Sequence, residues 1–165
     1  MDEPLGLLLL PRALEQFELE QHARALLQIP RVVALEPGRL RTPSFLRHAA
    51  PLRQAKRLKL PGVPRLVVLY HPVQYPLARA LITRYERAEL WYLRRETAGL
   101  SDEPGYARSE LIELDELAQE RAARIVPGSL AAELEAASEL LRDRMRALEI
   151  ISHRPFAPGG RMGRR

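Results

Sequence analysis

Apolar positions along this chain follow two patterns, continuous runs and recurrence at helical spacing, and the two patterns alternate. The stretch from Arg65 to Arg95 shows both of them. Leu66 to Tyr70 form an unbroken run rich in valine and leucine, which is typical of a strand buried on both faces of a parallel sheet. Pro76 suits the first turn of a helix, and the apolar side chains after it recur at helical spacing. Leu90 to Leu93 then supply a second strand, so the stretch predicts a right-handed crossover between parallel strands.

The same alternation extends in both directions along the chain. Further strands are predicted at Leu5 to Leu10, Val32 to Leu35 and Arg124 to Val126, the last overlapping the end of a long helix that follows the polar connection Thr97 to Gly105. Other helices are predicted at Leu14 to Gln28 and from a Ser129 cap to about Leu148. A short helix is predicted within Arg41 to Leu58, with Thr42 as its cap, Pro43 as its first residue and Pro51 as an interruption or a kink. This order predicts an α/β fold with a single Rossmann-like, doubly wound parallel sheet of about five strands.

The length and composition of the chain suit one soluble domain. It has 165 residues, of which 46% are hydrophobic and 28% charged, and this is enough to bury a core. Residues 1–151 are predicted to form the Rossmann-like domain. The proline, glycine and arginine clusters of residues 152–165 predict a disordered basic tail.

Polar side chains gather beyond the carboxyl ends of two predicted strands. In a doubly wound sheet the ligand crevice lies at that edge. The candidate binding residues there are Tyr70, Gln74 and Tyr75 after one strand and Arg94, Arg95 and Glu96 after the next, with His71 as the candidate catalytic group. Ser129 is expected first as a helix cap and second as a ligand contact at a helix start.

His71 could take a proton from a hydroxyl, because imidazole has an ordinary pKa close to neutrality. The alternative is structural: His71 bonds a loop carbonyl or packs beside Pro72, and no orienting carboxylate stands near it in the sequence. Two readings also hold for Arg94 and Arg95, which suit either a phosphate or carboxylate clamp or a solvated loop.

Charge is distributed unevenly along the chain, whose formal net charge is +5. No acidic residue occurs between Glu36 and Glu86, whereas the segment from Asp102 to Glu120 is rich in them. One interpretation is that the two regions neutralise each other in the fold. The other is a basic face for a phosphate-bearing or lipid-surface partner. The candidate anion-binding residues of that face are Arg53, Lys56, Arg57 and Lys59.

Several motifs that would assign a chemistry are missing. The sequence has no G-x-G-x-x-G after a strand and no Walker loop, so no cofactor is predicted. Cysteine is absent and the histidines lack metal-ligand spacing, so disulfides and thiolate metal sites are excluded and no metal site is predicted. A receiver-type phosphoacceptor site would need a carboxylate where the chain has Tyr70 and His71. Since no signal peptide or membrane span is recognisable, the expected location is the cytoplasm, peripheral to the inner face of the membrane if the basic face docks there.

Four segments together resemble the N-terminal half of GT-B type glycosyltransferases. They are Arg31 to Leu35, the RLVVLYHP stretch, the ELWY stretch and the ERAARIVPGS stretch, and with the leucine-rich first strand the match covers most of residues 5 to 148. In that family a Rossmann-like N-terminal domain binds the acceptor and a C-terminal domain grips the nucleotide-sugar. The resemblance implies transferase chemistry on a sugar or lipid-linked acceptor, with Tyr70, His71, Gln74 and Tyr75 lining the cleft.

The resemblance covers the acceptor-side half alone, because too few residues follow it to form a nucleotide-sugar domain. It therefore implies a truncated or standalone domain that is inactive as an isolated chain and is completed by a separate donor-domain polypeptide. One alternative is a non-enzymatic α/β module that binds a polyanion or nucleic acid, and another is an idle structural fragment. Nucleic acid is the less expected partner, because Phe45 is the only aromatic residue in the basic stretch from Arg39 to Lys59.

Overall fold

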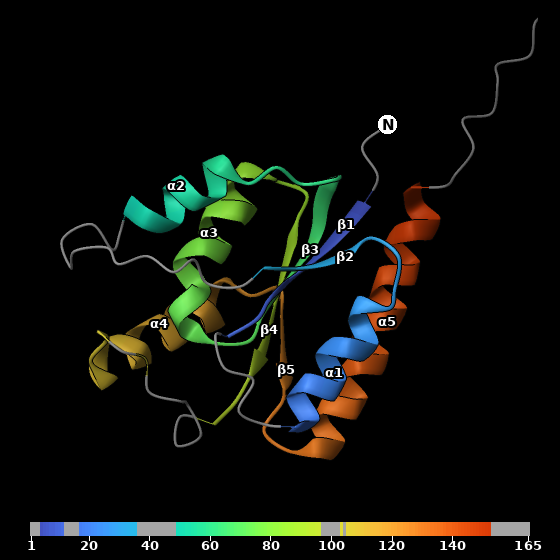
Figure 1. Ribbon diagram of the computed structural model, residues 1–165. Helices are drawn as coiled ribbons and strands as arrows, with labels where there is room; N and C mark the ends of the chain where they lie inside the picture. Colours follow the sequence, from blue (N-terminus) through green and yellow to red (C-terminus); the bar gives the residue numbers. More distant parts are fainter. Residues whose placement is uncertain (1–3, 12–16, 36–48, 97–102, 104, 153–165) are drawn as a thin grey trace, which may run out of the picture.

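The computed structural model describes residues 4–11, 17–35, 49–96, 103 and 105–152. They form one five-stranded, all-parallel sheet with helices on both faces (Figure 1), so the predicted α/β fold with a doubly wound, Rossmann-like sheet is confirmed. The elements in chain order are β1 (Pro4–Leu9), α1 (Phe17–Leu27), β2 (Val32–Leu35), α2 (Ala49–Arg57), β3 (Val63–Leu69), the short 3₁₀ helix η2 (Pro72–Gln74), α3 (Tyr75–Arg84), β4 (Glu89–Arg94), α4 (Arg108–Arg121), β5 (Arg124–Pro127) and α5 (Ala131–Ser152).

The strands lie in the order β2-β1-β3-β4-β5, which is the flavodoxin-like order of doubly wound sheets. From β1 the chain builds to one side for β2 and to the other for β3, β4 and β5. The direction of building therefore reverses between β1 and β3, and in such sheets ligands bind beyond the carboxyl ends of the strands at this switch point. β3 ends in Tyr70 and His71 rather than in the carboxylate that a receiver-type site would place there.

Alternate residues of the central strands feed two separate cores. Leu8, Val68 and Tyr70 pack on one face of the sheet, which α1 and α5 cover, and Leu7, Val67 and Leu69 pack on the other, which α2, α3 and α4 cover. Trp91 and Tyr92 follow the same rule and are buried on opposite faces. Burial on both faces explains why these strands read as continuous apolar runs.

Several predicted boundaries are wrong, each for a local reason. β5 does not overlap a helix, because α4 ends at Arg121 and two alanines separate it from the strand. Pro51 does not interrupt α2 but lies in its first turn, where a missing N–H costs nothing. α5 runs past its predicted end to Ser152. The predicted cap Thr42, the helix start Pro43 and all of the predicted tail 152–165 except Ser152 lie outside the described residues.

No helix in the described part of the chain combines the length and the apolar composition that crossing a bilayer requires.

Candidate functional site

The predicted site residues after β3 are held tightly by the fold. Tyr70, His71, Gln74 and Tyr75 are each 3 to 5% exposed. Tyr70 and His71 follow the end of β3, Gln74 lies in η2 and Tyr75 begins α3, so all four lie at the carboxyl edge of the sheet beside the switch point. Residues 12–16, 36–48 and 97–102 lie outside the described residues. The site is therefore described from the residues that follow β3 and β4.

Tyr70 belongs to a buried polar network between α1 and α5. Its hydroxyl lies 2.9 Å from Nε2 of His22, and Nδ1 of His22 lies 3.1 Å from the Leu134 carbonyl oxygen and 2.5 Å from Oγ of Ser138. A carbonyl can only accept, so Nδ1 carries the hydrogen, Nε2 accepts, and the Tyr70 hydroxyl donates to it. The Ser138 hydroxyl in turn donates to the Leu134 carbonyl.

Burial fixes the charge state of this network. It lowers the pKa of His22 from 6.5 to about 4, an effect that the bond to the Leu134 carbonyl partly opposes. Burial also raises the pKa of Tyr70 far above its ordinary value. Both side chains are therefore neutral at pH 7, and Tyr70 is turned into the core rather than toward a ligand. Neither His22 nor Ser138 was singled out from the sequence.

His71 caps the short helix that follows β3. The backbone N–H of Val73 donates to its Nδ1 over 3.2 Å, and the backbone N–H of Gln74 donates to its carbonyl oxygen over 3.1 Å. His71 is only 4% exposed. The bond that its Nδ1 accepts from Val73 gives His71 a structural part in η2, and its role as a proton acceptor stays a prediction.

Gln74 bridges the two strands at the switch point. Its Nε2 donates to the carbonyl oxygen of Leu10, just after β1, over 2.8 Å. Its other polar atom, Oε1, is buried and has no hydrogen-bond partner, although Gln74 is only 4% exposed. Buried amide oxygens are nearly always paired, so this atom marks a place where the described fold leaves an acceptor for something else.

Arg94 belongs to a second buried network, at the end of β4. Its Nη2 donates to Oδ2 of Asp115 over 3.0 Å and its Nε lies within 3.3 Å of both carboxylate oxygens. Asp115, on α4, also accepts from the Tyr92 hydroxyl over 2.6 Å and from Nε2 of Gln119 over 2.9 Å. Burial raises the pKa of Tyr92, and its bond to Asp115 adds to the rise. The Arg94 fork thus holds a carboxylate of the protein itself, which anchors α4 to the sheet.

The remaining predicted contacts lie nearer the surface. Glu96 is exposed, and its backbone N–H donates to Oγ of Ser129 over 3.0 Å. Arg95 is half-buried. The prediction that Ser129 caps α5 is wrong: Glu133 does so, accepting from the backbone N–H groups of Ser129 and Leu130 over 2.8 and 3.0 Å. The Ser129 hydroxyl instead ties the end of β4 to the start of α5.

The predicted anion-binding residues form one basic surface on and beside α2. Arg53, Lys56, Arg57 and Lys59 are all exposed, and none of them pairs with an acidic residue in the part of the chain that the structure describes. Leu52, 55% exposed, stands next to Arg53 in the helix. Behind them, Arg84 of α3 donates to the carbonyl oxygen of Ala55 over 2.6 Å and fixes α2 in place.

Metal-binding side chains do not gather in the described residues: nowhere in them do three or more histidines, aspartates or glutamates come together as a candidate metal site. No protein-family model, no curated protein and no solved structure matches this chain. The fold and its side-chain geometry are therefore the observations on which a function can be argued.

Proposed function

We propose that this chain is a glycosyltransferase-like acceptor domain, which binds a hydroxyl-bearing small molecule at the carboxyl edge of β1 and β3 and does not itself bind the nucleotide-sugar. The observation that carries the proposal is Oε1 of Gln74, a buried acceptor without a partner beside the switch point of the sheet. An unpaired buried acceptor costs about 1 to 3 kcal/mol. A ligand hydroxyl that donated to it would remove that cost.

The Gln74 amide is held in place for this role. Its bond to the Leu10 carbonyl fixes which end of the amide is the donor, so Oε1 keeps one direction. A preorganised acceptor binds a hydroxyl with little loss of conformational entropy. An amide oxygen does not take a proton at neutral pH, so Gln74 would orient the hydroxyl of the bound molecule without deprotonating it. Deprotonation of that hydroxyl would need another group in the completed enzyme.

The isolated chain would bind an acceptor but transfer nothing. Donor binding and transfer would need the nucleotide-sugar domain of the family that the chain resembles, so neither is expected of these 165 residues tested alone. Calorimetry on the purified chain separates the two halves of the reaction. We expect no saturable heat with UDP-, GDP- or dTDP-sugars, and weak saturable binding of simple polyols such as methyl glucoside and myo-inositol. Tight binding of a nucleotide-sugar would contradict this division of labour.

A second candidate function is docking on an anionic membrane through the basic surface beside α2. Its support is the combination of four exposed cations that lack acidic partners in the described residues with an exposed leucine, Leu52, next to Arg53. Cations attract anionic headgroups, and an apolar side chain among them can enter the headgroup boundary. Such docking is compatible with a lipid-linked acceptor, and it would hold the domain at the membrane surface.

A further inference from the structure

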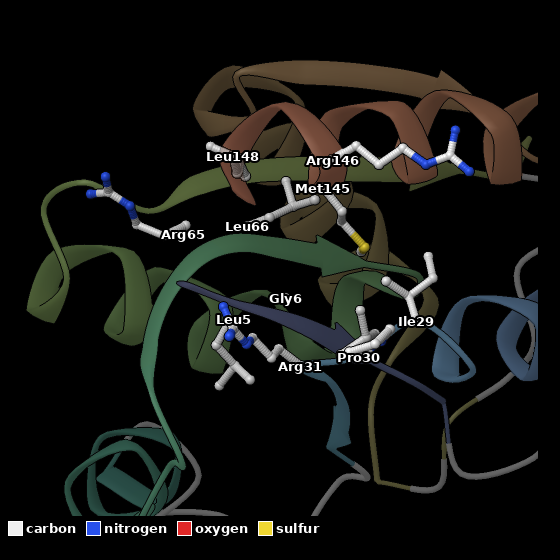
Figure 2. A pocket seen from close by; sticks show the side chains of 11 residues that line it. Leu5, Gly6, Ile29, Pro30, Arg31, Arg65, Leu66, Met145, Arg146 and Leu148 are labelled. Carbon is white, nitrogen blue, oxygen red and sulfur yellow. The ribbon is translucent and has the colours of Figure 1, made fainter. Parts of the chain in front are cut away.

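A small hollow lies at the edge of the sheet opposite to the candidate site. Its volume is about 40 Å³, and it is bounded by the amino ends of β1 and β3, the turn between α1 and β2, and the last turns of α5 (Figure 2). Apart from three arginines, Arg31, Arg65 and Arg146, its lining in the described residues is apolar and holds no acidic side chain. An apolar space with arginines at its rim suits a ligand that is itself both apolar and anionic.

Gly6 makes room for the end of Met145 in the wall of this hollow. A Cβ at position 6 would lie 3.1 Å from Cε of Met145 and 3.5 Å from a methyl group of Val32. The other positions of β1 from Leu5 onward are leucine, and a glycine inside a strand weakens it unless close approach is needed there. The glycine interrupts a leucine strand at the point where the thioether of Met145 reaches down from α5 (Figure 2).

The three arginines of the lining lie on different sides of the hollow. In Figure 2, Arg65 and Arg146 lie on opposite sides of Met145, and Arg31 comes from the turn before β2. The side chain of Arg146 is 68% exposed, and its nearest carboxylate oxygen, on Asp143, is 3.9 Å away, too far for a hydrogen bond. A planar guanidinium binds carboxylate and phosphate groups through two parallel hydrogen bonds.

We propose that this hollow receives the end of an alkyl chain whose other end is an anion, a carboxylate or a phosphate monoester held by these arginines. A space of about 10 to 15 Å³ on this measure holds one water-sized group, so the hollow has room for a few methyl or methylene groups at the tip of a chain. The chain tip enters over Leu66 and Met145, and the anionic head stays at the mouth. This site is independent of Gln74 and of the proposed acceptor function.

The methyl group of Met145 gives a direct readout on the intact chain. The protein has three methionines, and Met145 is the one in the lining, so methyl-labelled methionine gives a small set of signals that Met145→Leu assigns. Titration with hexyl phosphate or hexanoate is expected to shift the Met145 signal saturably and to leave the other two in place. Hexanol and inorganic phosphate are expected to bind at least about tenfold more weakly, since each lacks one half of the interaction.

Two substitutions test the two halves of the site separately. Gly6→Ala puts a methyl group into the hollow, and because its nearest contact is the flexible end of Met145, the fold should survive, as a thermal melt will check. We expect its affinity for hexyl phosphate to fall at least about tenfold, and Arg146→Gln to lower it several-fold. Arg142→Gln, one turn earlier on α5 and outside the lining, should change it less than about twofold.

Three results would overturn the proposal. The first is a Met145 signal in the wild-type chain that neither anion moves saturably, and this result decides the matter even if Gly6→Ala does not fold. The second is a folded Gly6→Ala chain that binds hexyl phosphate as tightly as the wild type. The third is hexanol or inorganic phosphate binding as tightly as hexyl phosphate.

Discussion

The Tyr70 hydroxyl donates to Nε2 of His22 over 2.9 Å, inside a core that holds both side chains neutral. The bond joins β3 to α1, and His22 passes the connection on to Ser138 and Leu134 of α5. Three elements that are far apart in the sequence thus share one buried polar network. Folding therefore determines the protonation state of His22 and Tyr70.

The first prediction is that His22 makes stability fall as the pH is lowered. Its pKa is about 4 in the folded chain and 6.5 ordinarily, so the unfolded chain takes up the proton first. The contribution is fully present above pH 6.5 and is lost as the pH falls to about 4, and over that window it amounts to about 3 kcal/mol. Urea unfolding at a series of pH values measures it.

His22→Gln is the control for this measurement, because it removes the titrating imidazole and leaves the carboxylates and the other histidines in place. The difference between the wild-type and His22→Gln curves isolates the histidine. The variant should lose less stability between pH 6.5 and 4 than the wild type. Parallel curves would show that His22 is not held neutral by the fold.

The second prediction concerns Asp115, which accepts hydrogen bonds from Tyr92, Arg94 and Gln119. Asp115→Ala leaves a buried hydroxyl and a partly buried cation without their acceptor, and the free energy of unfolding should fall by about 3 to 5 kcal/mol. Asp143→Ala is the matched control, since Asp143 is exposed and its nearest arginine nitrogen is 3.9 Å away. It should cost less than about 0.5 kcal/mol. Equal effects of the two substitutions in urea would rule out an anchoring role for Asp115.

The third prediction separates the two roles considered for His71. His71→Ala removes the acceptor for the Val73 N–H and opens a small cavity, so stability should fall by about 1 to 3 kcal/mol. His71→Asn keeps a side-chain oxygen that can accept the same bond and should recover most of the loss. Thermal melts of both variants measure this. An unchanged melting temperature for His71→Ala would instead favour the functional role of this histidine over the structural one.

The fourth prediction tests the basic surface beside α2. Replacing Arg53, Lys56, Arg57 and Lys59 by glutamine should abolish binding to vesicles of anionic lipid, and wild-type binding should weaken steeply with salt because exposed charges are screened over about 8 Å at physiological ionic strength. Co-sedimentation at low and high salt measures both effects. Leu52→Asn should weaken the binding without changing its salt dependence. Binding that survives the four substitutions would leave this surface without a role.

The local patterns of the sequence predicted the elements well, because each depends on nearby residues. The run Leu66 to Tyr70 and the helical spacing after Pro76 were sufficient to place β3 and α3. The overlap predicted between α4 and β5 is wrong. The helical spacing of apolar residues continues through the two alanines after Arg121, so the sequence pattern does not show where the helix ends. The order of the strands depends on long-range pairing, which no local pattern carries.

The site was harder to predict because its partners lie far apart in the sequence. His22 and Ser138 are 116 residues apart. For Arg94 the sequence left open a ligand clamp or a solvated loop, whereas the acceptor of its guanidinium is Asp115 on the next helix. A signal was available for two of the missed residues. His22 and Asp115 both lie on the apolar faces of their helices, beside Ala23 and between Leu111 and Ala118, where a polar side chain needs a buried partner.

The account depends most on Oε1 of Gln74, and the side-chain amide signal of Gln74 in a nitrogen-15 spectrum tests it most directly. Titration with methyl glucoside and myo-inositol should shift that signal saturably for at least one of the two. Gln74→Leu should lower the affinity for that polyol by at least about tenfold, which is one lost hydrogen bond to a buried acceptor. Gln28→Leu, at an exposed position after α1, should leave it unchanged. An amide signal that neither polyol moves, or a Gln74→Leu chain that binds the polyol as tightly as the wild type, would contradict the proposed acceptor site.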